Sequence, residues 1–214
     1  MKDYISSLRM DYTKYYLDEN DLLVSPMSQF VKWLDLAIQT KAQEANMMVL
    51  STISADGYPN SRVMLLKDVA NDGFIFFTNY KSAKGLELTS NPKANLTFFW
   101  AEREQQVRVK GLVEKISREQ SVEYFNSRPI GSKISVCVSD QSSVVKNRQE
   151  LEDKTQQMEI GTLGEEIKCP EYWGGYILKP IEMEFWQGRA NRLHDRLKYV
   201  LNEDGKWEII RLAP

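Results

Sequence analysis

The chain has 214 residues, a length that fits one large domain or one domain with short appendages. Hydrophobic residues make up 42% of it and aromatic residues 11%, which is enough for a packed core and excludes an intrinsically disordered chain. Its 28 basic and 30 acidic residues leave a formal net charge of -2, without the clustered positive charge typical of proteins that bind nucleic acid or anionic membranes. We therefore expect no nucleic-acid partner and no membrane partner.

The N-terminus and the two cysteines indicate a soluble, cytoplasmic protein. The stretch from Met1 to Tyr12 mixes charged and apolar side chains and lacks the apolar centre of a signal peptide. No apolar stretch is long enough to cross a bilayer. Cys137 and Cys169 lie far apart and form no metal-ligand motif, so we expect reduced thiols and no metal site.

The first pattern along the chain is helical. Apolar residues recur at helical spacing from Phe30 to Ile38, and Ser25 and Pro26 provide a cap and a first-turn proline. Short apolar and β-branched segments follow, joined by turns such as Ala55-Asp56-Gly57. The segments predicted as strands are residues 47–53, 62–67, 74–78, 94–100, 105–116, 172–185 with a break at Pro180, 198–201 and 207–212.

Helices are predicted between several of these strands. A helix over residues 82–89 is expected to stop at Asn91-Pro92, because proline restricts the residue before it. Ser117 and Gln120 have the spacing of a capping box and should open a helix through Phe125. The charged segment 142–166 is predicted to be helical with a loop. Short strands joined mainly by Asp-Gly turns favour a single domain of mainly β (α+β) class, an antiparallel barrel with helices outside.

The polar residues alone leave two interpretations open. The one histidine, His194, lies in a charged stretch between Arg192 and Arg196, where a surface role is commoner than catalysis, although guanidinium groups bind phosphate well. Further basic residues fall beside strand ends and turns: Arg62, Lys67, Lys81, Lys84 and Arg128. Lys81 and Lys84 flank an expected helix start, where free amides and the helix dipole favour an anion. These clusters either solubilise the surface or bind small phosphorylated ligands.

The motifs that the sequence lacks narrow the chemistry. It contains no dinucleotide-binding glycine motif, no P-loop, no zinc-protease motif and no serine-hydrolase nucleophile elbow. Without a metal site or an obvious nucleophile, redox chemistry would need a bound organic cofactor. The residues by themselves therefore predict a β-rich binder of phosphorylated ligands, with cofactor-dependent chemistry as one alternative.

A series of ordered strings resembles the pyridoxine/pyridoxamine 5'-phosphate oxidase family. The strings are Arg62-Val63-Met64-Leu65-Leu66-Lys67, Phe77-Thr78-Asn79, Tyr124-Phe125-Asn126-Ser127-Arg128-Pro129, Gln141-Ser142-Ser143, Phe185-Trp186-Gln187-Gly188, Arg192-Leu193-His194-Asp195-Arg196 and Arg211-Leu212-Ala213-Pro214. The likeness runs in order from Leu8-Arg9 to the last residue. Any one string is unspecific, whereas the ordered set is highly specific.

The resemblance implies an FMN-binding split β-barrel with flanking helices that forms a homodimer, with FMN sites across the subunit interface. It implies an N-terminal arm over residues 1–20 that closes over the active site, followed by a single domain over residues 21–214. The residues implied to contact FMN from one chain are Arg62, Val63, Met64, Leu65, Leu66, Lys67, Phe77, Thr78, Lys84 and Gln106. Those implied to contact it from the partner chain are Gln141, Ser142, Trp186 and Arg196.

The activity that the resemblance implies is oxidation of pyridoxamine or pyridoxine 5'-phosphate to pyridoxal 5'-phosphate, in vitamin B6 biosynthesis and salvage. A hydride would pass to FMN, and O2 would be reduced to H2O2. The residues implied to hold the substrate are Lys67, Tyr124, Arg128 and Ser132 at its phosphate, Arg192, Leu193 and His194 at its ring, and Arg9 and Tyr12 of the arm. Arg192 and His194 would be the catalytic residues.

Two alternative functions remain open at this point. Another split-barrel flavin oxidoreductase would keep the FMN strings but would not need Tyr124, Arg128 or Ser132. A non-catalytic protein that binds or carries FMN or pyridoxal phosphate would not need Arg192 and His194. Both alternatives are weakened because these residues are present.

Overall fold

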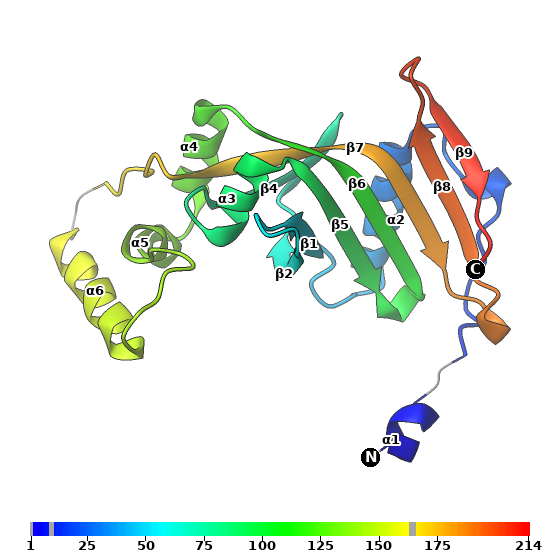
Figure 1. The fold of residues 1–214 in the computed structure, drawn as a ribbon, viewed down its shortest axis with the longest axis horizontal. Coiled ribbons are helices and arrows are strands. Elements are labelled where there is room, and N and C mark those ends of the chain that lie inside the picture. Colours follow the sequence, from blue (N-terminus) through cyan, green and yellow to red (C-terminus); the bar gives the residue numbers. More distant parts are fainter. Residues whose placement is uncertain (1, 9–10, 163–165) are drawn as a thin grey trace.

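The computed structural model describes residues 2–8, 11–162 and 166–214. Within these residues the strands form one nine-stranded sheet, whose main path runs in the order β2-β1-β5-β6-β7-β4-β3. β8 pairs with β7, and β9 pairs with β8. The sheet is curled and helices flank it, which confirms the predicted mainly β fold with flanking helices (Figure 1).

The bounds of the elements agree well with the sequence pattern. The strands are β1 (Met47–Ile53), β2 (Pro59–Leu65), β3 (Asp68–Ala70), β4 (Gly73–Asn79), β5 (Lys93–Trp100), β6 (Gln105–Lys115), β7 (Trp173–Gln187), β8 (Asp195–Leu201) and β9 (Trp207–Arg211). The helices are α1 (Lys2–Ser7), α2 (Pro26–Gln39), α3 (Ala83–Ser90), α4 (Arg118–Ser127), α5 (Ile130–Val138) and α6 (Arg148–Gly161), with short 3-10 turns η1 (Glu19–Asp21), η2 (Ala101–Arg103) and η3 (Ala190–Arg192). None of the helices in the described ranges combines the length and apolar composition needed to cross a bilayer.

Some elements were not predicted from the sequence. β3 has only three residues, too few for a periodic pattern. α5 is rich in β-branched residues, which lower helix propensity and hide its helical character. β8 begins at Asp195, earlier than the predicted residue 198, because pairing with β7 extends the strand beyond its apolar part.

The predicted break at Pro180 is wrong, because β7 continues through it. Pro180 faces Gly111 of β6, whereas the next pair joins Glu182 to Lys110, so Ile181 is an extra residue that bulges out of the ladder. A bulge accommodates proline, which lacks the N–H that a regular ladder position would use. Position 111 has no room for a side chain, because a Cβ atom there would collide with the carbonyl oxygen of Lys179.

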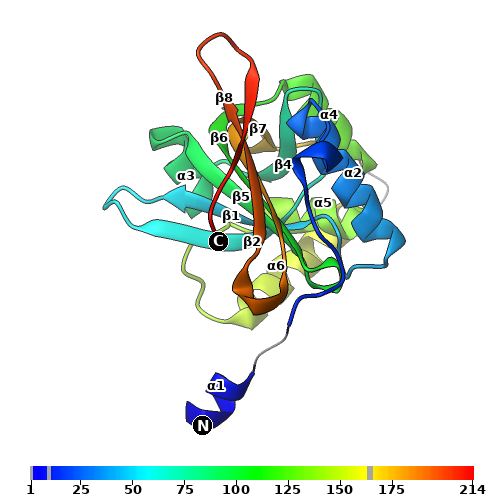
Figure 2. The same ribbon diagram turned by 90° about the vertical axis from the view of Figure 1, so that its right-hand side faces the viewer.

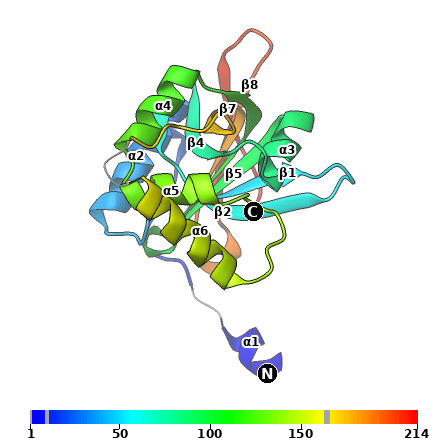
Figure 3. The ribbon, with the colours of Figure 1, turned by 90° about the vertical axis from the view of Figure 1, so that its left-hand side faces the viewer.

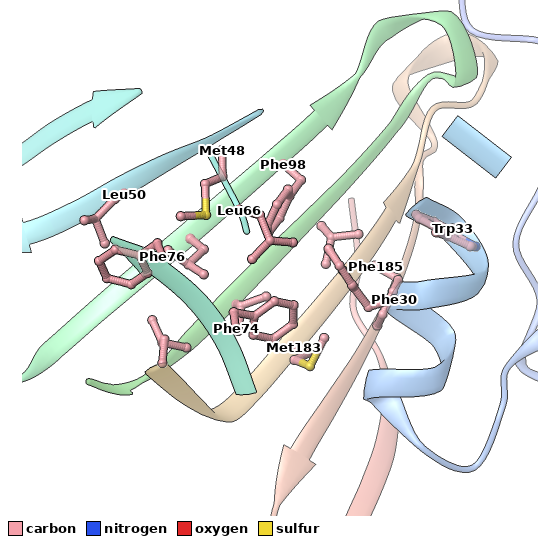
Figure 4. Packing of buried hydrophobic residues seen from close by; sticks show 14 of the residues in the cluster. Phe30, Trp33, Met48, Leu50, Leu66, Phe74, Phe76, Phe98, Met183 and Phe185 are labelled. Atoms are coloured by element: carbon pink, nitrogen blue, oxygen red, sulfur yellow. The ribbon is translucent and has the colours of Figure 1, made fainter. Parts of the chain in front are cut away.

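The main core lies between the curled sheet and α2 (Figure 4). Ser25 caps α2 by accepting a hydrogen bond from the Ser28 amide at 3.3 Å, as its sequence predicted. The ring of Phe30 lies 4.8 Å from that of Phe74, and the Trp33 ring lies 5.1 Å from that of Phe185. Each such buried aromatic contributes roughly 1.5–3 kcal/mol, so α2 is firmly fixed to the sheet.

A smaller apolar cluster fixes the helices at the start of β7. Phe125 of α4, Ile134 of α5 and Trp173 of β7 are buried together in it. α5 and α6 lie side by side at this end of the molecule (Figure 3). At the other end, the β8–β9 hairpin and the N-terminal segment lie on the same side of the molecule (Figure 2). These two ends carry the predicted site residues.

Candidate functional site

A cavity of about 330 Å³ lies at the start of β7, a volume within the range of roughly 300–1,000 Å³ that is typical of small-molecule sites. Its lining consists of Met64, Lys67, Phe77, Thr78, Asn79, Tyr124, Arg128, Ser135, Val136, Ser139, Gln141 and Trp173. The predicted site residues that it brings together are Met64, Lys67, Phe77, Thr78, Tyr124, Arg128 and Gln141. We call it the β7 cavity.

Three aromatic side chains form one wall of the β7 cavity. The ring of Phe77 lies 3.9 Å from that of Tyr124 and 5.4 Å from that of Trp173. The planes of Tyr124 and Trp173 are inclined by only 7°. Nearly parallel rings of this kind suit a flat aromatic ligand, because such a ligand can stack against them.

Arg128 supplies the β7 cavity with a positive charge. Its guanidinium carbon lies 5.0 Å from the centre of the Trp173 ring. Among the described residues, no group accepts a hydrogen bond from its buried Nη1 atom. Burial lowers the pKa of Arg128, but a guanidinium group still keeps its proton at neutral pH. A buried, charged donor without an acceptor is unfavourable, so the cavity fits an anion, and exposed Lys67 adds a second cation.

A second pair of cations, Arg62 and Lys84, borders the β7 cavity; we call it the Arg62–Lys84 cluster. Nη2 of Arg62 lies 3.1 Å from Oε2 of Glu87, and Nδ2 of Asn60 donates to the other oxygen of Glu87 at 2.7 Å. Nζ of Lys84 lies 3.3 Å from the hydroxyl oxygen of Thr78, which lines the cavity. The cluster therefore joins the cavity through Thr78.

The charges of the Arg62–Lys84 cluster favour an additional anion. Burial lowers the pKa of Lys84, Arg62 lowers it further, and Glu87 opposes both effects. Burial alone would raise the pKa of Glu87, but hydrogen bonds from Thr52, Asn60 and Arg62 outweigh it and lower that pKa. Glu87 is therefore ionised, and a single carboxylate faces two cations.

Gln141 and Ser142 lie beside this cluster in the same chain. Thr78 donates from its hydroxyl to Oε1 of Gln141 at 3.3 Å, and the Ala83 amide donates to the Ser142 hydroxyl at 3.2 Å. Ala83 begins α3, so Ser142 contacts the positive end of the helix dipole. The loop after α5 therefore carries Gln141 to Thr78 and Ser142 to Ala83 within one chain, whereas their predicted contact with FMN from the partner chain stays a prediction.

The remaining predicted residues gather at the far end of β7. Trp186 faces Gln106 of β6 and Arg196 of β8, so the three side chains share one face of the sheet. The ring of His194 lies 4.6 Å from that of Trp186, and Tyr12 of the N-terminal segment lies 5.7 Å from Trp186 and 5.9 Å from His194. We call Tyr12, Gln106, Trp186, His194 and Arg196 the Trp186 cluster.

One chain does not bring the β7 cavity and the Trp186 cluster together. Phe77 of the cavity pairs with Gly175 of β7, whereas Gln106 pairs with Trp186. These two positions of β7 are separated by up to about 36 Å at ~3.3 Å per residue. Figure 1 shows α4 and α5 at one end of β7 and the β7–β8 connection at the other. The prediction that Gln106 lies near Phe77 and Thr78 of the same chain is therefore wrong.

His194 has a defined tautomer. The backbone amide of Arg189 donates to its Nδ1 at 3.0 Å, so the neutral ring carries its proton on Nε2. Burial lowers the pKa of His194, the nearby charge of Arg192 lowers it further, and Asp195 opposes this. At neutral pH His194 is therefore a hydrogen-bond donor through Nε2. Arg192 itself is exposed and has a left-handed backbone with φ of 61°.

The last residues of the chain form hydrogen bonds with Arg196 and with the segment that precedes α2. Arg196 donates from Nε to Glu184 at 2.9 Å and from Nη1 to the carbonyl of Ala213 at 2.9 Å. Arg211 donates to Glu19 at 2.7 Å and to Asp195 at 3.1 Å. The last residues therefore position Arg196 and tie the segment before α2 to β8.

Several predicted residues do not present side chains to the β7 cavity. Leu66 is buried in the main core, Val63 and Leu193 are exposed, and Leu65 is absent from the residues that line the cavity. Ser132 lies one helical turn before Ser135, which does line it. Arg9 lies outside the described residues.

Sequence reasoning missed some residues of the site. They are Asn79, Ser135, Ser139, Trp173 and Glu87. Ser135 and Ser139 are four apart, a spacing that points to one face only once α5 is known to be a helix. Glu87 follows Lys84 by three positions on α3, so helical spacing contained a signal for that pair.

Comparison with known proteins identifies the family. Residues 34–160 match the family model described as pyridoxamine 5'-phosphate oxidase, and residues 173–214 match the pyridoxine 5'-phosphate oxidase C-terminal dimerisation region. A pyridoxine/pyridoxamine 5'-phosphate oxidase of Cupriavidus necator is 47% identical over 210 residues, which cover 98% of this chain and 99% of the relative. The chain belongs to the pyridoxine/pyridoxamine 5'-phosphate oxidase family. A further member of that name, from a Nostoc species, is also 47% identical and covers 98% of each chain.

Solved structures share the fold of this chain. PhzG from Burkholderia lata, in complex with tetrahydrophenazine-1-carboxylic acid, superposes with a TM-score of 0.89 at 28% identity, covering 95% of this chain and 100% of PhzG. A pyridoxamine 5'-phosphate oxidase-related, FMN-binding protein from Nostoc punctiforme superposes with a TM-score of 0.71 at 15% identity, covering 90% and 100% of the two chains. The second likeness confirms the split-barrel fold. Membership of the oxidase family makes this chain an enzyme.

Proposed function

We propose that this chain oxidises pyridoxamine 5'-phosphate or pyridoxine 5'-phosphate to pyridoxal 5'-phosphate, with FMN as cofactor and O2 as electron acceptor. The observation that carries the proposal is the β7 cavity, where Arg128 and Lys67 lie beside a wall of stacked aromatic rings. A phosphate group would satisfy the buried Nη1 of Arg128, and a pyridine ring fits the flat wall.

FMN fits the Arg62–Lys84 cluster. Two cations there face one carboxylate, and the start of α3 adds its dipole, so a phosphate group would be stabilised. Arg62 and Lys84 would hold the FMN phosphate, with Thr78, Gln141 and Ser142 as hydrogen-bonding neighbours. The chemistry that bound FMN supplies is acceptance of a hydride from the substrate and reoxidation by O2, which yields H2O2.

We propose a homodimer in which the Trp186 cluster of one copy meets the β7 cavity of the other. The match of residues 173–214 to a dimerisation region supports this arrangement, since Trp186, His194 and Arg196 fall within it. The separation of the two groups along β7 also supports it, because one chain alone leaves both incomplete. The FMN site would then lie at the interface, with Gln106, Trp186 and Arg196 contributed by the second copy.

The chain's own residues orient the substrate and control its charge. Lys67 and Arg128 would bind its phosphate, and Ser132 and Tyr124 lie on the helices next to them. Fixing the phosphate and the ring together removes orientational entropy from the barrier. Arg192 would exclude water and face the substrate ring, and Tyr12 would help to close the arm over it.

His194 would donate a hydrogen bond from Nε2 to the substrate. Its Nδ1 is already an acceptor for the Arg189 amide, so at neutral pH it does not serve as the base. The alcohol and O2 give the aldehyde and H2O2, and the amine additionally consumes water and releases ammonia.

Aerobic absorbance spectroscopy tests the proposal. Purified protein with FMN is given pyridoxamine 5'-phosphate and, separately, pyridoxine 5'-phosphate, and aldehyde and peroxide are measured together. The proposal predicts that both products form in equal amounts. A yellow protein that forms no aldehyde would indicate a carrier instead.

The likeness to PhzG raises a second candidate, a flavin oxidase of reduced tricyclic aromatics. A reduced phenazine precursor, tested in parallel, separates the two candidates. Turnover of the phenazine precursor without turnover of pyridoxamine 5'-phosphate or pyridoxine 5'-phosphate would contradict our proposal. Lys67 and Arg128 favour the phosphorylated substrates, because a phosphate group carries more negative charge at neutral pH than the single carboxylate of the phenazine acid and gains more from two cations.

A further inference from the structure

A separate cavity of about 190 Å³ lies beneath the N-terminal segment, between that segment, α2 and the turn from η2 to β6. Its lining consists of Tyr15, Tyr16, Leu17, Asp21, Gln29, Lys32, Trp33, Leu36, Arg103 and Gln105. None of these residues belongs to the β7 cavity, the Arg62–Lys84 cluster or the Trp186 cluster. We call it the Arg103 cavity.

Arg103 carries an uncompensated charge in this cavity. Arg103 is only 7% exposed to solvent. Its Nε donates to Oε1 of Gln105 at 2.8 Å, and its guanidinium carbon lies 4.5 Å from the centre of the Tyr15 ring. Within residues 11–162 and 166–214, no carboxylate forms an ion pair with it. Arginine is rarely buried without a charged partner, so this position favours an anion.

Gln29 adds an unused hydrogen-bond donor to the Arg103 cavity. The side chain is fully buried, and its Oε1 accepts from the Leu23 amide at 3.0 Å. In the described part of the chain its Nε2 has no hydrogen-bond partner. A buried amide donor without an acceptor costs about 1–3 kcal/mol, which a ligand oxygen would recover.

The other charges of the cavity leave it net positive. Lys32 lines it and donates from Nζ to the carbonyl of Asp21 at 3.2 Å. The Asp21 carboxylate accepts from the Asp18 amide at 3.1 Å and is the one acidic side chain in the lining. Two cations therefore stand against one carboxylate.

We propose that the Arg103 cavity binds a small oxyanion, a carboxylate or a phosphate, through Arg103 and Gln29. Its volume of about 190 Å³ is far above the ~10–15 Å³ that one water needs and below the roughly 300 Å³ at which sites for drug-sized ligands begin. The ligand is thus a small ion or metabolite. The rings of Tyr15 and Trp33 give its carbon atoms apolar surfaces to contact.

A bound oxyanion would hold the N-terminal segment on the barrel. The Lys14 amide donates to Oε2 of Glu104 at 3.1 Å, and Tyr15 covers Arg103. Tyr12, just before them, contacts Trp186 and His194 and packs so closely on Gly188 that a Cβ there would collide with its ring. Opening of this segment would expose the anion, so occupancy opposes opening.

Hydrogen exchange of the protein with FMN tests the site, with inorganic phosphate and acetate as separate probes. At a probe concentration ten times its Kd, exchange of the amides in residues 12–17 should slow about tenfold, because opening requires release of the ion. The ion that acts at the lower concentration shows which headgroup the cavity prefers.

Three variants assign the effect to the cavity. Gln29→Glu keeps the acceptor for the Leu23 amide but replaces the donor by a carboxylate in the cavity that Arg103 also lines, so the protection should vanish. Arg148→Gln removes the guanidinium group of a side chain that is 89% exposed, and this variant should keep the protection. Arg128→Leu removes the group proposed to bind phosphate in the β7 cavity, and this variant should also keep the protection of residues 12–17. Protection that persists in Gln29→Glu, or that fails to appear in the unsubstituted protein, would overturn the proposal.

Discussion

Replacing Arg128 with leucine is expected to move catalysis and stability in opposite directions. One or two charge-assisted hydrogen bonds to the substrate phosphate would be lost, worth about 2–4 kcal/mol. At 1.4 kcal/mol per decade this lowers kcat/KM for pyridoxamine 5'-phosphate about 30- to 700-fold. In the free protein, however, the variant removes a buried Nη1 atom that has no acceptor within the described residues.

The stability of the Arg128→Leu variant follows from the same geometry. Loss of the interaction with Trp173, whose ring centre lies 5.0 Å away, costs about 0.5–1 kcal/mol. Removal of the unsatisfied donor returns about 1–3 kcal/mol. The free energy of unfolding in urea should therefore be unchanged or rise by up to about 2.5 kcal/mol.

Arg118, the first residue of α4, provides a matched control for Arg128, which follows the last residue of the same helix. Its guanidinium group donates to the carbonyls of Cys169 at 2.5 Å, Pro170 at 3.2 Å and Trp173 at 2.9 Å, so it is a structural residue. Arg118→Leu should lower the free energy of unfolding by about 2–4 kcal/mol and change kcat/KM of the folded enzyme little. If Arg128→Leu behaves in the same way as Arg118→Leu, the assigned role of Arg128 is refuted.

Three further variants test other parts of the account. The Arg62→Gln, Glu87→Gln double variant removes a guanidinium group without leaving a carboxylate unpaired, and it should bind FMN at least tenfold more weakly in a fluorescence titration; unchanged affinity would be contrary evidence. The pKa of His194 is lowered from 6.5, so protonation of His194 should reduce kcat/KM only below pH 6.5. This decrease at acidic pH should be absent in His194→Asn. A decrease that begins above pH 6.5 and depends on His194 would contradict a neutral His194 that donates a hydrogen bond. Tyr199→Phe removes a hydrogen bond of 2.6 Å to the Leu23 carbonyl and should cost about 1 kcal/mol in urea unfolding. Burial raises the pKa of Tyr199 from 10.0 to about 12, so this advantage over the phenylalanine variant should shrink as pH rises between those values, and a constant difference would argue against it.

The sequence was a good guide wherever local patterns decide structure. The apolar and β-branched run of β1, the cap and first-turn proline of α2 and the Asp-Gly turns each specify their element through neighbouring residues. The predicted break at Pro180 is wrong because a β-bulge next to the Pro180–Gly111 pair lets the strand accommodate the proline. This bulge depends on pairing with β6, which lies far away in the sequence. α5 was missed because tertiary packing around Ile134 overrides its weak helix propensity.

The candidate site was predictable as a set of residues but not as a geometry. The strings of the family include Lys67, Tyr124 and Arg128, which the structure brings to one cavity. They contain no information on which residues of one chain meet, so Gln106 was grouped with Phe77 and Thr78, from which the strand register separates it. Strand register decides that grouping, because β7 carries the two groups at its opposite ends.

A mixed dimer tests most directly whether two copies complete the active site. Arg128→Leu chains and Arg192→Ala chains, each expected to have little activity alone, are unfolded, mixed in equal amounts and refolded together. If the β7 cavity of one copy works with Arg192 of the other, half of the dimers carry one intact site, and activity should return to about one quarter of the unsubstituted level. No recovery, in mixtures shown to contain mixed dimers, would contradict the account, because a site built within one chain would remain damaged in every copy.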